Sequence, residues 1–429
     1  MDSMGVTVWR VSRQRRYAAC PCRMDPGPPM PPETVASRRI VILLGLLTGI
    51  GAIAIDMALP AIPAMAEVLE SPISVGQQIV GVFILGVGLG QLPAGVISDR
   101  VGRLPVLMAG MTIFTAAGAV TVLATSMDAM LVARFVQGLG ASTGLVIARA
   151  VVRDISSGAE SARILSLMVA IFTFAPMVAP VIGGFLVEHF DWRAPFAFVS
   201  VIGVLLLIAA RLILPETGRR NSRGHFFRQL WNSSLEFASH RRSVLGVLLI
   251  VLPSMGFMPV LSFASALIID LYGFTPAQFG FVFALAGLSI LTGALLNRRL
   301  LLRFGTIQLI GIGAGILGVA GLSLAVIAWQ GAVGFWWVWG SVCLYTSGVS
   351  FIAANATAMA LDPVPEIAGA ASSIIGTLQN VFGALSAIAA GLLYNGTVAS
   401  CIIMMAVFGL LTFSLFLGRG VVLRDDSDE

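Results

Sequence analysis

The sequence predicts an all-α membrane protein that crosses the bilayer twelve times, with its helices in two halves of six. Three observations support this fold class: the composition, the length of the apolar runs, and one long polar connection near the middle. Of the 429 residues, 57% are hydrophobic and only 11% are charged, whereas soluble proteins carry about 25% charged residues. The chain therefore has too little polar surface to cover a water-soluble globule.

The apolar residues form runs of about 18 residues or more, the length that a helix needs to cross a bilayer. From Ile40 onward the pattern predicts twelve membrane spans. They cover approximately residues 40–65, 74–97, 104–125, 128–151, 161–187, 194–214, 243–268, 278–297, 306–328, 332–356, 368–394 and 398–418. Most connections between them are short.

The one long polar connection, about residues 215–242, has six spans on each side. The predicted organisation is a basic N-terminal tail, a first six-helix bundle, a central loop, a second six-helix bundle and an acidic C-terminal tail. These parts cover residues 1–39, 40–214, 215–242, 243–418 and 419–429. We expect the N-terminal tail to be disordered, because it combines scattered arginines with the proline-rich stretch PGPPMPP. Met24 and Met30 are alternative translation starts.

The arginines predict the orientation, since the chain contains no lysine. If the N-terminus is cytosolic, all but two of the 26 basic residues lie on the cytosolic side or at the cytosolic helix ends. The exceptions are Arg193 on the outer side and Arg134 within a span. Positively charged residues collect on the cytosolic side of membrane proteins, so we expect both termini in the cytosol.

An internal repeat supports the division into two similar halves. A glycine, an acid or its amide, and an arginine follow the second span and recur after the eighth, 198 residues later. The two sets are Gly95, Asp99 and Arg100, and Gly293, Asn297 and Arg298. Two units that share one orientation form a parallel repeat about an axis along the membrane normal.

Three segments of the chain resemble signatures of the major facilitator superfamily. GVISDRVGR (95–103) is similar to its loop between helices 2 and 3, LVARFVQGLGAS (131–142) to its helix 4, and APMVAPVIGG (175–184) to the helix-5 motif of its drug:proton antiporters. Other stretches resemble the bicyclomycin-resistance (Bcr/CflA) branch: IDMALPAIP (55–63), GQLPAGVISDRVGRLPV (90–106), ARAVVRD (148–154), DWRAPF (191–196) and LPET (214–217). The resemblance covers about residues 40–418. The chain departs from it at Leu104, where the family often has a basic residue, and at Ala179, where the motif usually has glycine.

The resemblance implies a multi-pass protein of the bacterial inner membrane that exports small amphipathic drugs in exchange for protons by alternating access. Such a transporter needs no cofactor, since the proton gradient supplies the energy. Its expected partners are drug-like molecules, protons and the lipid bilayer, without nucleic acid, and a monomer suffices. The alternatives are a proton-coupled transporter of a native metabolite on the same fold and, from another class, a membrane-embedded enzyme. The sequence has no phosphate-binding loop and no metal-ligand spacing to support an enzyme.

The turn after the second span carries an acid that membrane topology does not require, because acidic residues contribute little to orientation. We expect Asp99 to pair with Arg100 and to face the positive N-terminus of the helix that begins near Ala368. The resemblance implies that this turn holds the cytosolic ends of the two halves together when the cavity opens outward. We name its candidate residues the latch: Gly95, Asp99, Arg100, Gly102 and Arg103. The alternative is a simple charged turn.

Two charges lie deep within spans and are candidates for proton coupling. Arg134 lies about seven residues into the fourth span, where a lone charge costs about 2.5–3.5 kcal/mol or more. Asp56, on the first span, is its expected partner, and Pro60 and Pro63 follow it and should loosen the helix. The alternatives are an arginine that reaches the outer interface and a purely structural ion pair. Asp270, near the outer end of the seventh span, is the next candidate for the proton site.

Two further groups of residues are candidates for the transport path. On the fifth span, small residues and prolines form a stripe that the resemblance assigns to contact with the other half: Pro176, Ala179, Pro180, Gly183 and Gly184. The cavity candidates are polar, flexible or aromatic, which suits varied amphipathic ligands: Gln137, Met255, Phe257, Met258, Tyr345 and Asn355. A kinked, closely packed helix and ordinary core packing are the respective alternatives.

Overall fold

The computed structural model describes residues 38–218, 226–331 and 334–419, and these ranges are almost entirely helical. The α-helices are α1 (Arg38–Asp56), α2 (Ile62–Val68), α3 (Ile73–Gly76), α4 (Gln78–Val101), α5 (Arg103–Leu123), α6 (Met127–Ile155), α7 (Gly158–His189), α8 (Ala194–Ile213), α9 (Phe226–Ser239), α10 (Arg241–Ser265), α11 (Pro276–Leu300), α12 (Thr306–Gln330), α13 (Phe335–Leu361), α14 (Ala368–Leu393) and α15 (Val398–Leu417). Short helices η1 (Leu59–Ala61), η2 (Ala266–Leu271) and η3 (Pro365–Ile367) adjoin them.

Twelve helical segments within these ranges are long and apolar enough to cross a membrane, which confirms the predicted spans. Breaks inside spans, together with α9 outside them, account for the larger number of helices. The first span consists of α1, η1 and α2, the second of α3 and α4, the seventh of α10 and η2, and the eleventh of η3 and α14. The expected tails lie outside the described residues, apart from the first residues of α1 and Arg419.

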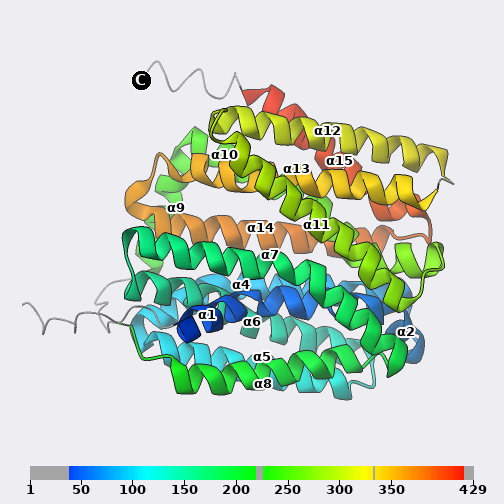
Figure 1. The fold of residues 1–429 in the computed structure, drawn as a ribbon, viewed down its shortest axis with the longest axis horizontal. Helices are drawn as coiled ribbons and strands as arrows, with labels where there is room; N and C mark the ends of the chain where they lie inside the picture. The colour runs from blue at the N-terminus through cyan, green and yellow to red at the C-terminus, as the bar shows by residue number, and fades with distance from the viewer. Residues whose placement is uncertain (1–37, 219–225, 332–333, 420–429) are drawn as a thin grey trace, which may run out of the picture. The chain divides into compact units, whose positions relative to one another are not determined.

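The two halves pack against each other mainly through two helix pairs, α4 with α14 and α7 with α11. In Figure 1 the helices of the second half, light green to red, are stacked above those of the first half, blue to green, with α14 and α7 at the boundary between the halves. Close backbone approaches mark both pairs. A Cβ at Gly88 of α4 would lie 3.1 Å from the Cβ of Asn380 on α14, and a Cβ at Gly280 of α11 would lie 2.6 Å from the carbonyl oxygen of Pro180 on α7.

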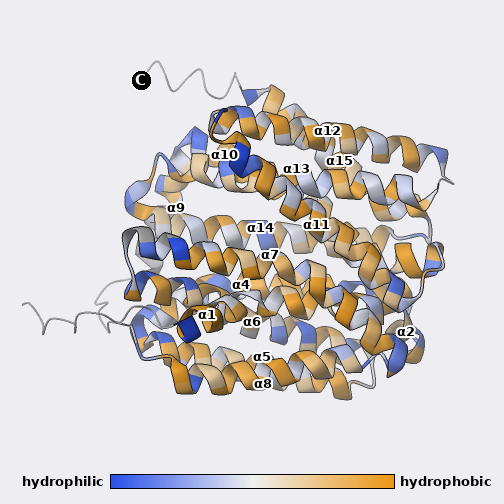
Figure 2. Cartoon of the chain, in the orientation of Figure 1, coloured by the Kyte–Doolittle hydropathy of each residue, from blue (hydrophilic) through white to orange (hydrophobic). Residues whose placement is uncertain are grey.

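Hydrophobic residues cover the middle of the helices, and hydrophilic residues gather mainly at their ends (Figure 2). One set of ends carries most of the arginines, including Arg100 and Arg153, and we call these the arginine-rich ends. The opposite, arginine-poor ends include Asp270 and the N-terminus of α11. Large apolar side chains such as Leu212 are 79% exposed on the outer helices, a favourable arrangement where lipid replaces water as the surrounding medium.

The central loop contains a helix that the sequence analysis treated as part of a polar connection. Helix α9 packs against α10 and α14. Phe237 is buried and Leu235 is 55% exposed. The helix forms because its apolar face finds a surface to cover, despite the polar composition around it.

Candidate functional site

Asp56 is the last residue of α1 and lies at a break in the first span. The chain continues through η1, which begins one residue before Pro60, into α2, whose second residue is Pro63. The prolines therefore interrupt the helix, as the sequence predicts. Asp56 is 5% exposed, and no hydrogen bond or ion pair joins its side chain to any other described residue. A carboxyl group is thus buried beside a helix break, in the interior of the first half.

Arg134 on α6 is fully buried and held by neutral groups. Its Nη1 donates to Oε1 of Gln137 at 2.9 Å, and its Nη2 donates to the carbonyl oxygen of Ala54 at 3.2 Å. The guanidinium carbon lies 4.4 Å from the ring centre of Phe83 and 5.7 Å from that of Phe196. Its Nε has no hydrogen-bond acceptor among the described residues. Aromatic faces stabilise a desolvated cation by about 2 kcal/mol in favourable cases.

The expected ion pair between Asp56 and Arg134 is not formed in this structure. Arg134 instead bonds to α1 two residues earlier, at the carbonyl of Ala54. The last carbonyl groups of a helix lack intrahelical donors, and the amide of Ala58 donates to Ile55 rather than to Ala54. Arg134 therefore donates to a carbonyl group that lacks an intrahelical donor. The spacing of charges in the sequence does not reveal this partner.

The latch turn is held by a network centred on Arg103. Its guanidinium forms ion pairs with Asp99 on α4 and with Asp154 on α6, the latter at 3.0 Å from Nε to Oδ2. Its Nη1 also donates to Oγ of Ser98 at 2.8 Å. Gly102, between α4 and α5, has a φ of +117°, a conformation open to glycine but rare for other residues, so the predicted tight turn is present.

Arg153, and not the expected Asp99, lies at the N-terminus of α14. A Cβ at Gly369 would lie 3.0 Å from Nη1 of Arg153 on α6, and no described contact joins Asp99 to α14. The side chain of Asp99 is 51% exposed. A cation at a helix N-terminus is unfavourable, whereas an anion there is favourable. In this conformation the latch is therefore not engaged with α14.

Sequence reasoning missed two residues that contact the latch, Asp154 and Glu216, and a third, Thr217, that contacts Asp154. Asp154 accepts hydrogen bonds from Arg103 and from Oγ1 of Thr217. Glu216 accepts from the backbone amides of Arg103 and Leu104. The available signal was the presence of these residues in the stretches ARAVVRD and LPET, which carry the resemblance but had no assigned role.

The stripe on α7 contacts both the first span and the opposite half. A Cβ at Gly183 would overlap the carbonyl oxygen of Met57, the residue after Asp56. A Cβ at Gly184 would overlap the carbonyl oxygen of Pro276, the first residue of α11. Further along, Pro180 lies against Gly280, and Pro176 lies near Gly287. Ala179 is 3% exposed and belongs to the core of the first half.

The polar cavity candidates lie in the packing of the separate halves. Tyr345 is fully buried and donates to the carbonyl of Pro253 at 3.1 Å. Asn355 is buried and its Nδ2 donates to Oδ1 of Asn297 at 2.8 Å. Gln137 on α6 is buried against α5, where a Cβ at Gly118 would lie 2.9 Å from its Nε2. Hydrogen-bond partners within the same half thus hold these three side chains away from a cavity between the halves.

The apolar cavity candidates remain compatible with that role. Met255, Phe257 and Met258 on α10 are half-buried. Met258 packs against α14, where a Cβ at Gly383 would lie 2.8 Å from its Cγ.

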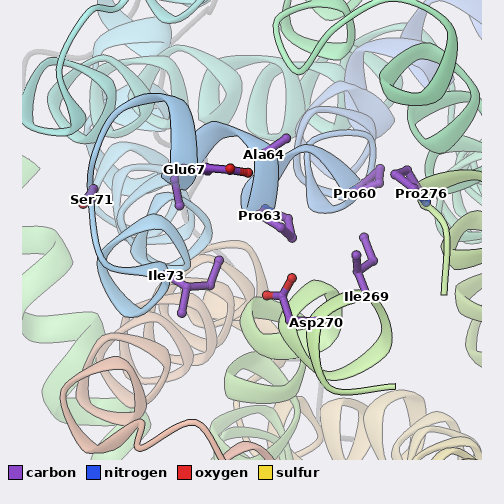
Figure 3. A pocket seen from close by; sticks show the side chains of 10 residues that line it. Pro60, Pro63, Ala64, Glu67, Ser71, Ile73, Ile269, Asp270 and Pro276 are labelled. Carbon is purple, nitrogen blue, oxygen red and sulfur yellow. The ribbon is translucent and has the colours of Figure 1, made fainter. Parts of the chain in front are cut away.

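A pocket of about 450 Å³ lies at the arginine-poor end, between α2 and η2 (Figure 3). Asp270 projects towards Pro63 across this pocket, and Glu67 lines it from α2. Asp270 is exposed, in contrast to Asp56. A carboxylate that is largely exposed to water carries less of the desolvation cost that opposes its charged form than a buried one does, which favours Asp56 over Asp270 as the candidate proton site.

Comparisons with known proteins agree with these features. The model of the Major Facilitator Superfamily matches residues 44–387. A bicyclomycin resistance protein homolog of Haemophilus influenzae is 28% identical over 346 residues, which are 80% of this chain and 87% of that protein. Multidrug resistance protein D of Escherichia coli strain K12 is 29% identical over 377 residues, 87% of this chain and 93% of that protein.

Solved structures share the fold at lower identity. The xylose transporter XylE from Escherichia coli has a TM-score of 0.69 at 15% identity, covering 89% of this chain and 97% of that one. A bacterial homolog of the human lysosomal transporter Spinster has a TM-score of 0.72 at 14% identity, covering 90% and 97%. The twelve spans, the family match and the related bacterial proteins lead to one conclusion: this chain belongs to the Major Facilitator Superfamily and is a multi-pass transporter of the inner membrane, not an enzyme.

Proposed function

We propose that this transporter exports small amphipathic drugs in exchange for protons, with Asp56 as the proton-binding group. The names of the related proteins, which include bicyclomycin and multidrug resistance, support drug-like substrates. The burial of Asp56 supports proton coupling, because a buried carboxylate is costly while it is charged and unpaired. One chain supplies both halves, so the monomer is the proposed working unit.

The observation that carries the proposal is the position of two adjacent glycines on α7. Gly183 lies against the backbone of Met57, directly after Asp56, and Gly184 lies against the first residue of α11 in the opposite half. Packed backbones transmit displacements because interiors are as dense as crystals. A change at Asp56 that shifts the end of α1 would therefore displace α7, which lies between α1 and α11 of the other half.

The proposed cycle follows from this contact and from the arginine distribution. The positive-inside rule places the arginine-rich ends in the cytosol. The arginine-poor ends of α7 and α11 are closely packed in this conformation, and in the proposed cycle a drug molecule binds from the cytosol when the arginine-rich ends separate. Proton movement inward supplies about 2.3 kcal/mol per 100 mV of membrane potential, plus the contribution of the pH gradient. That energy drives export when protonation and drug occupancy favour opposite states.

Transport assays in proteoliposomes with imposed pH gradients test the proposal. Exchange predicts uphill drug movement out of the proton-poor compartment when protons flow in the opposite direction, and loss of this uphill movement in Asp56→Asn. Asp270→Asn is the matched control and retains the uphill movement. Drug movement in the same direction as protons would contradict exchange and favour the alternative of a metabolite symporter, which a substrate panel then tests.

A further inference from the structure

A carboxylate of the first half contacts the start of a helix in the second half. Glu188 is the second-last residue of α7, and α11 begins at Pro276. Oε2 of Glu188 accepts a hydrogen bond from the backbone amide of Ala277 at 3.0 Å and another from Oγ1 of Thr275 at 3.2 Å. These hydrogen bonds join the two halves at the arginine-poor ends, and we call the residues Glu188, Thr275 and Ala277 the clasp.

The charge of Glu188 suits α11 and not its own helix. The first amides of a helix have no intrahelical acceptors, and negative charge is favourable beside them. The last turn of a helix presents unpaired carbonyl groups, and negative charge is unfavourable there. Glu188 lies in the last turn of α7, and no ion pair joins it to any residue that the structure describes. Its favourable electrostatic contact is therefore with the start of α11, in the opposite half.

The charged residues that follow Glu188 have other partners. The ring of His189 stacks on Phe185, with the ring centres 4.1 Å apart. Arg193 lies beside Asp191, at 3.7 Å from Nη1 to Oδ2. These basic groups thus do not compete with α11 for the carboxylate of Glu188.

The packing of α7 on α11 holds the clasp in place. Gly184 lies one turn before Glu188 on the same face of α7, and a Cβ there would overlap the carbonyl oxygen of Pro276. Within α11, the hydroxyl of Thr275 accepts from the backbone amide of Gln278 at 3.3 Å. This bond uses an oxygen lone pair, so the hydroxyl proton remains for Glu188.

The other pair of interface helices has neutral contacts at the same ends. There α14, close to its last residue, approaches α3 and the start of α4. A Cβ at Gly391 would lie 3.4 Å from the carbonyl oxygen of Ser74 and 3.4 Å from Cγ of Gln78. Among the residues that the structure describes, the charged contact between the halves at these ends therefore belongs to α7 and α11.

We propose that Glu188 is a gating residue, which stabilises the state in which the arginine-poor ends of α7 and α11 are closed. This inference rests on the alternating access of the proposed function. When these ends separate, Glu188 loses both donors of α11 and stays at the unfavourable end of α7, with water as its remaining partner. The carboxylate therefore favours the closed arginine-poor ends over the open ones.

The test measures the separation of the arginine-poor ends directly. Spin labels are placed on Leu123→Cys at the end of α5 and on Trp329→Cys near the end of α12, where the side chains are 77% and 87% exposed. The background replaces all four native cysteines with serine: Cys20, Cys22, Cys343 and Cys401. The distance distribution is compared for the parent and for three variants, Glu188→Ala, Glu188→Gln and Glu188→Asp.

Asp128→Asn is the matched control. Asp128 is exposed and lies in the first turn of α6, at the arginine-poor end of the same half. The change therefore removes one negative charge beside a helix start, as Glu188→Gln does, but leaves the contact between α7 and α11 in place.

We expect Glu188→Ala to shift the distribution towards longer distances and to raise the ratio of open to closed arginine-poor ends about fivefold, a modest change because the carboxylate is exposed. Glu188→Gln keeps an oxygen acceptor without the charge and gives an intermediate shift. Glu188→Asp keeps the charge on a shorter side chain that does not reach α11, and it shifts the distances as Glu188→Ala does. Asp128→Asn gives the parent distribution.

Drug affinity provides a second readout. If the drug binds the state that faces the cytosol, a smaller population of that state raises the apparent dissociation constant, by at most about the same fivefold factor. A shift in the distances without a change in affinity would keep the inference and contradict the proposed preference of the drug for this state.

Parent-like distances in Glu188→Ala, or an equal shift in Asp128→Asn, would overturn the inference. If Glu188→Ala does not fold, parent-like distances in both Glu188→Gln and Glu188→Asp overturn it equally. The label distances require neither a drug nor a proton gradient, so they test the clasp separately from the proposed function.

Discussion

Gly183 lies directly against the carbonyl oxygen of Met57, and no side chain could be added to it without displacing the end of α1. The next residue, Gly184, has the same relationship to Pro276 at the start of α11. The end of α1, the stripe on α7 and the opposite half are therefore in continuous backbone contact beside Asp56. This contact gives the stripe a physical role: it joins the proposed proton site to the interface that must separate during transport.

Gly183→Ala should lower the transport rate about tenfold or more, the equivalent of roughly 1.4 kcal/mol at the barrier. The added methyl group overlaps backbone atoms, which cannot move aside as a flexible side chain can. Initial rates of drug transport in vesicles, normalised to the amount of protein in the membrane, measure the effect. Gly315→Ala on α12 is the control, because a Cβ there meets no atom within 4 Å. Equal rates in the two variants would show that the contact with Met57 is not required.

Asp99→Asn should reduce transport strongly while leaving drug binding and membrane expression intact. The change removes one of the two ion pairs of Arg103, and it removes the negative charge that the latch would present to the N-terminus of α14. Cysteine accessibility should show fewer molecules open at the arginine-poor ends. Normal drug resistance in cells that express this variant would contradict the hypothesis that the latch holds the cytosolic ends of the two halves together.

Leu104→Arg should be tolerated. Leu104 contributes its backbone amide to Glu216, and a substitution of the side chain leaves that hydrogen bond in place. A basic residue also suits the arginine-rich end, since positive charge is favoured on the cytosolic side. Transport and thermal stability of the purified variant should match the parent. Inactivity at normal expression would mean that the half-buried leucine side chain has a packing role that arginine cannot fill.

Tyr345→Phe should lower the stability of the second half without changing drug affinity. The phenol donates to the carbonyl of Pro253, and loss of such a buried hydrogen bond costs about 1–3 kcal/mol. Thermal unfolding in detergent and equilibrium drug binding test the two parts separately. Met258→Ala, on the half-buried face of α10, should lower drug affinity without lowering thermal stability. A large loss of drug affinity in Tyr345→Phe would contradict this prediction and indicate that the tyrosine lines the drug-binding cavity.

The fold could be predicted from the sequence because each span is one continuous run of apolar residues, long enough to cross the bilayer. The break after Asp56 was also local, since Pro60 and Pro63 cannot continue a regular helix. Helix α9 was missed for a related reason: its few apolar residues matter only when α10 and α14 offer a surface for them.

The contacts of the site were harder to predict because they join distant segments. Glu216 and Arg103 are 113 residues apart, and no periodicity connects them. The partner of Arg134 depends on which carbonyl at the end of α1 lacks a donor, a detail of backbone geometry. The charges in the sequence predict Asp56 as the partner that neutralises Arg134, whereas in the structure a carbonyl group, a side-chain amide and two aromatic rings surround the arginine.

Asp56 has no ion-pair partner in the described part of the chain, and this makes a direct measurement possible. A carboxyl group without a cationic partner changes its proton occupancy when a drug alters its surroundings, and the change is visible as protons released into solution. The measurement is drug-induced proton release from the purified transporter in weak buffer, compared between the parent and Asp56→Asn. Proton coupling through Asp56 predicts release of about one proton per bound drug from the parent and none from the variant. Equal release from both proteins would contradict the assignment of Asp56 as the proton site.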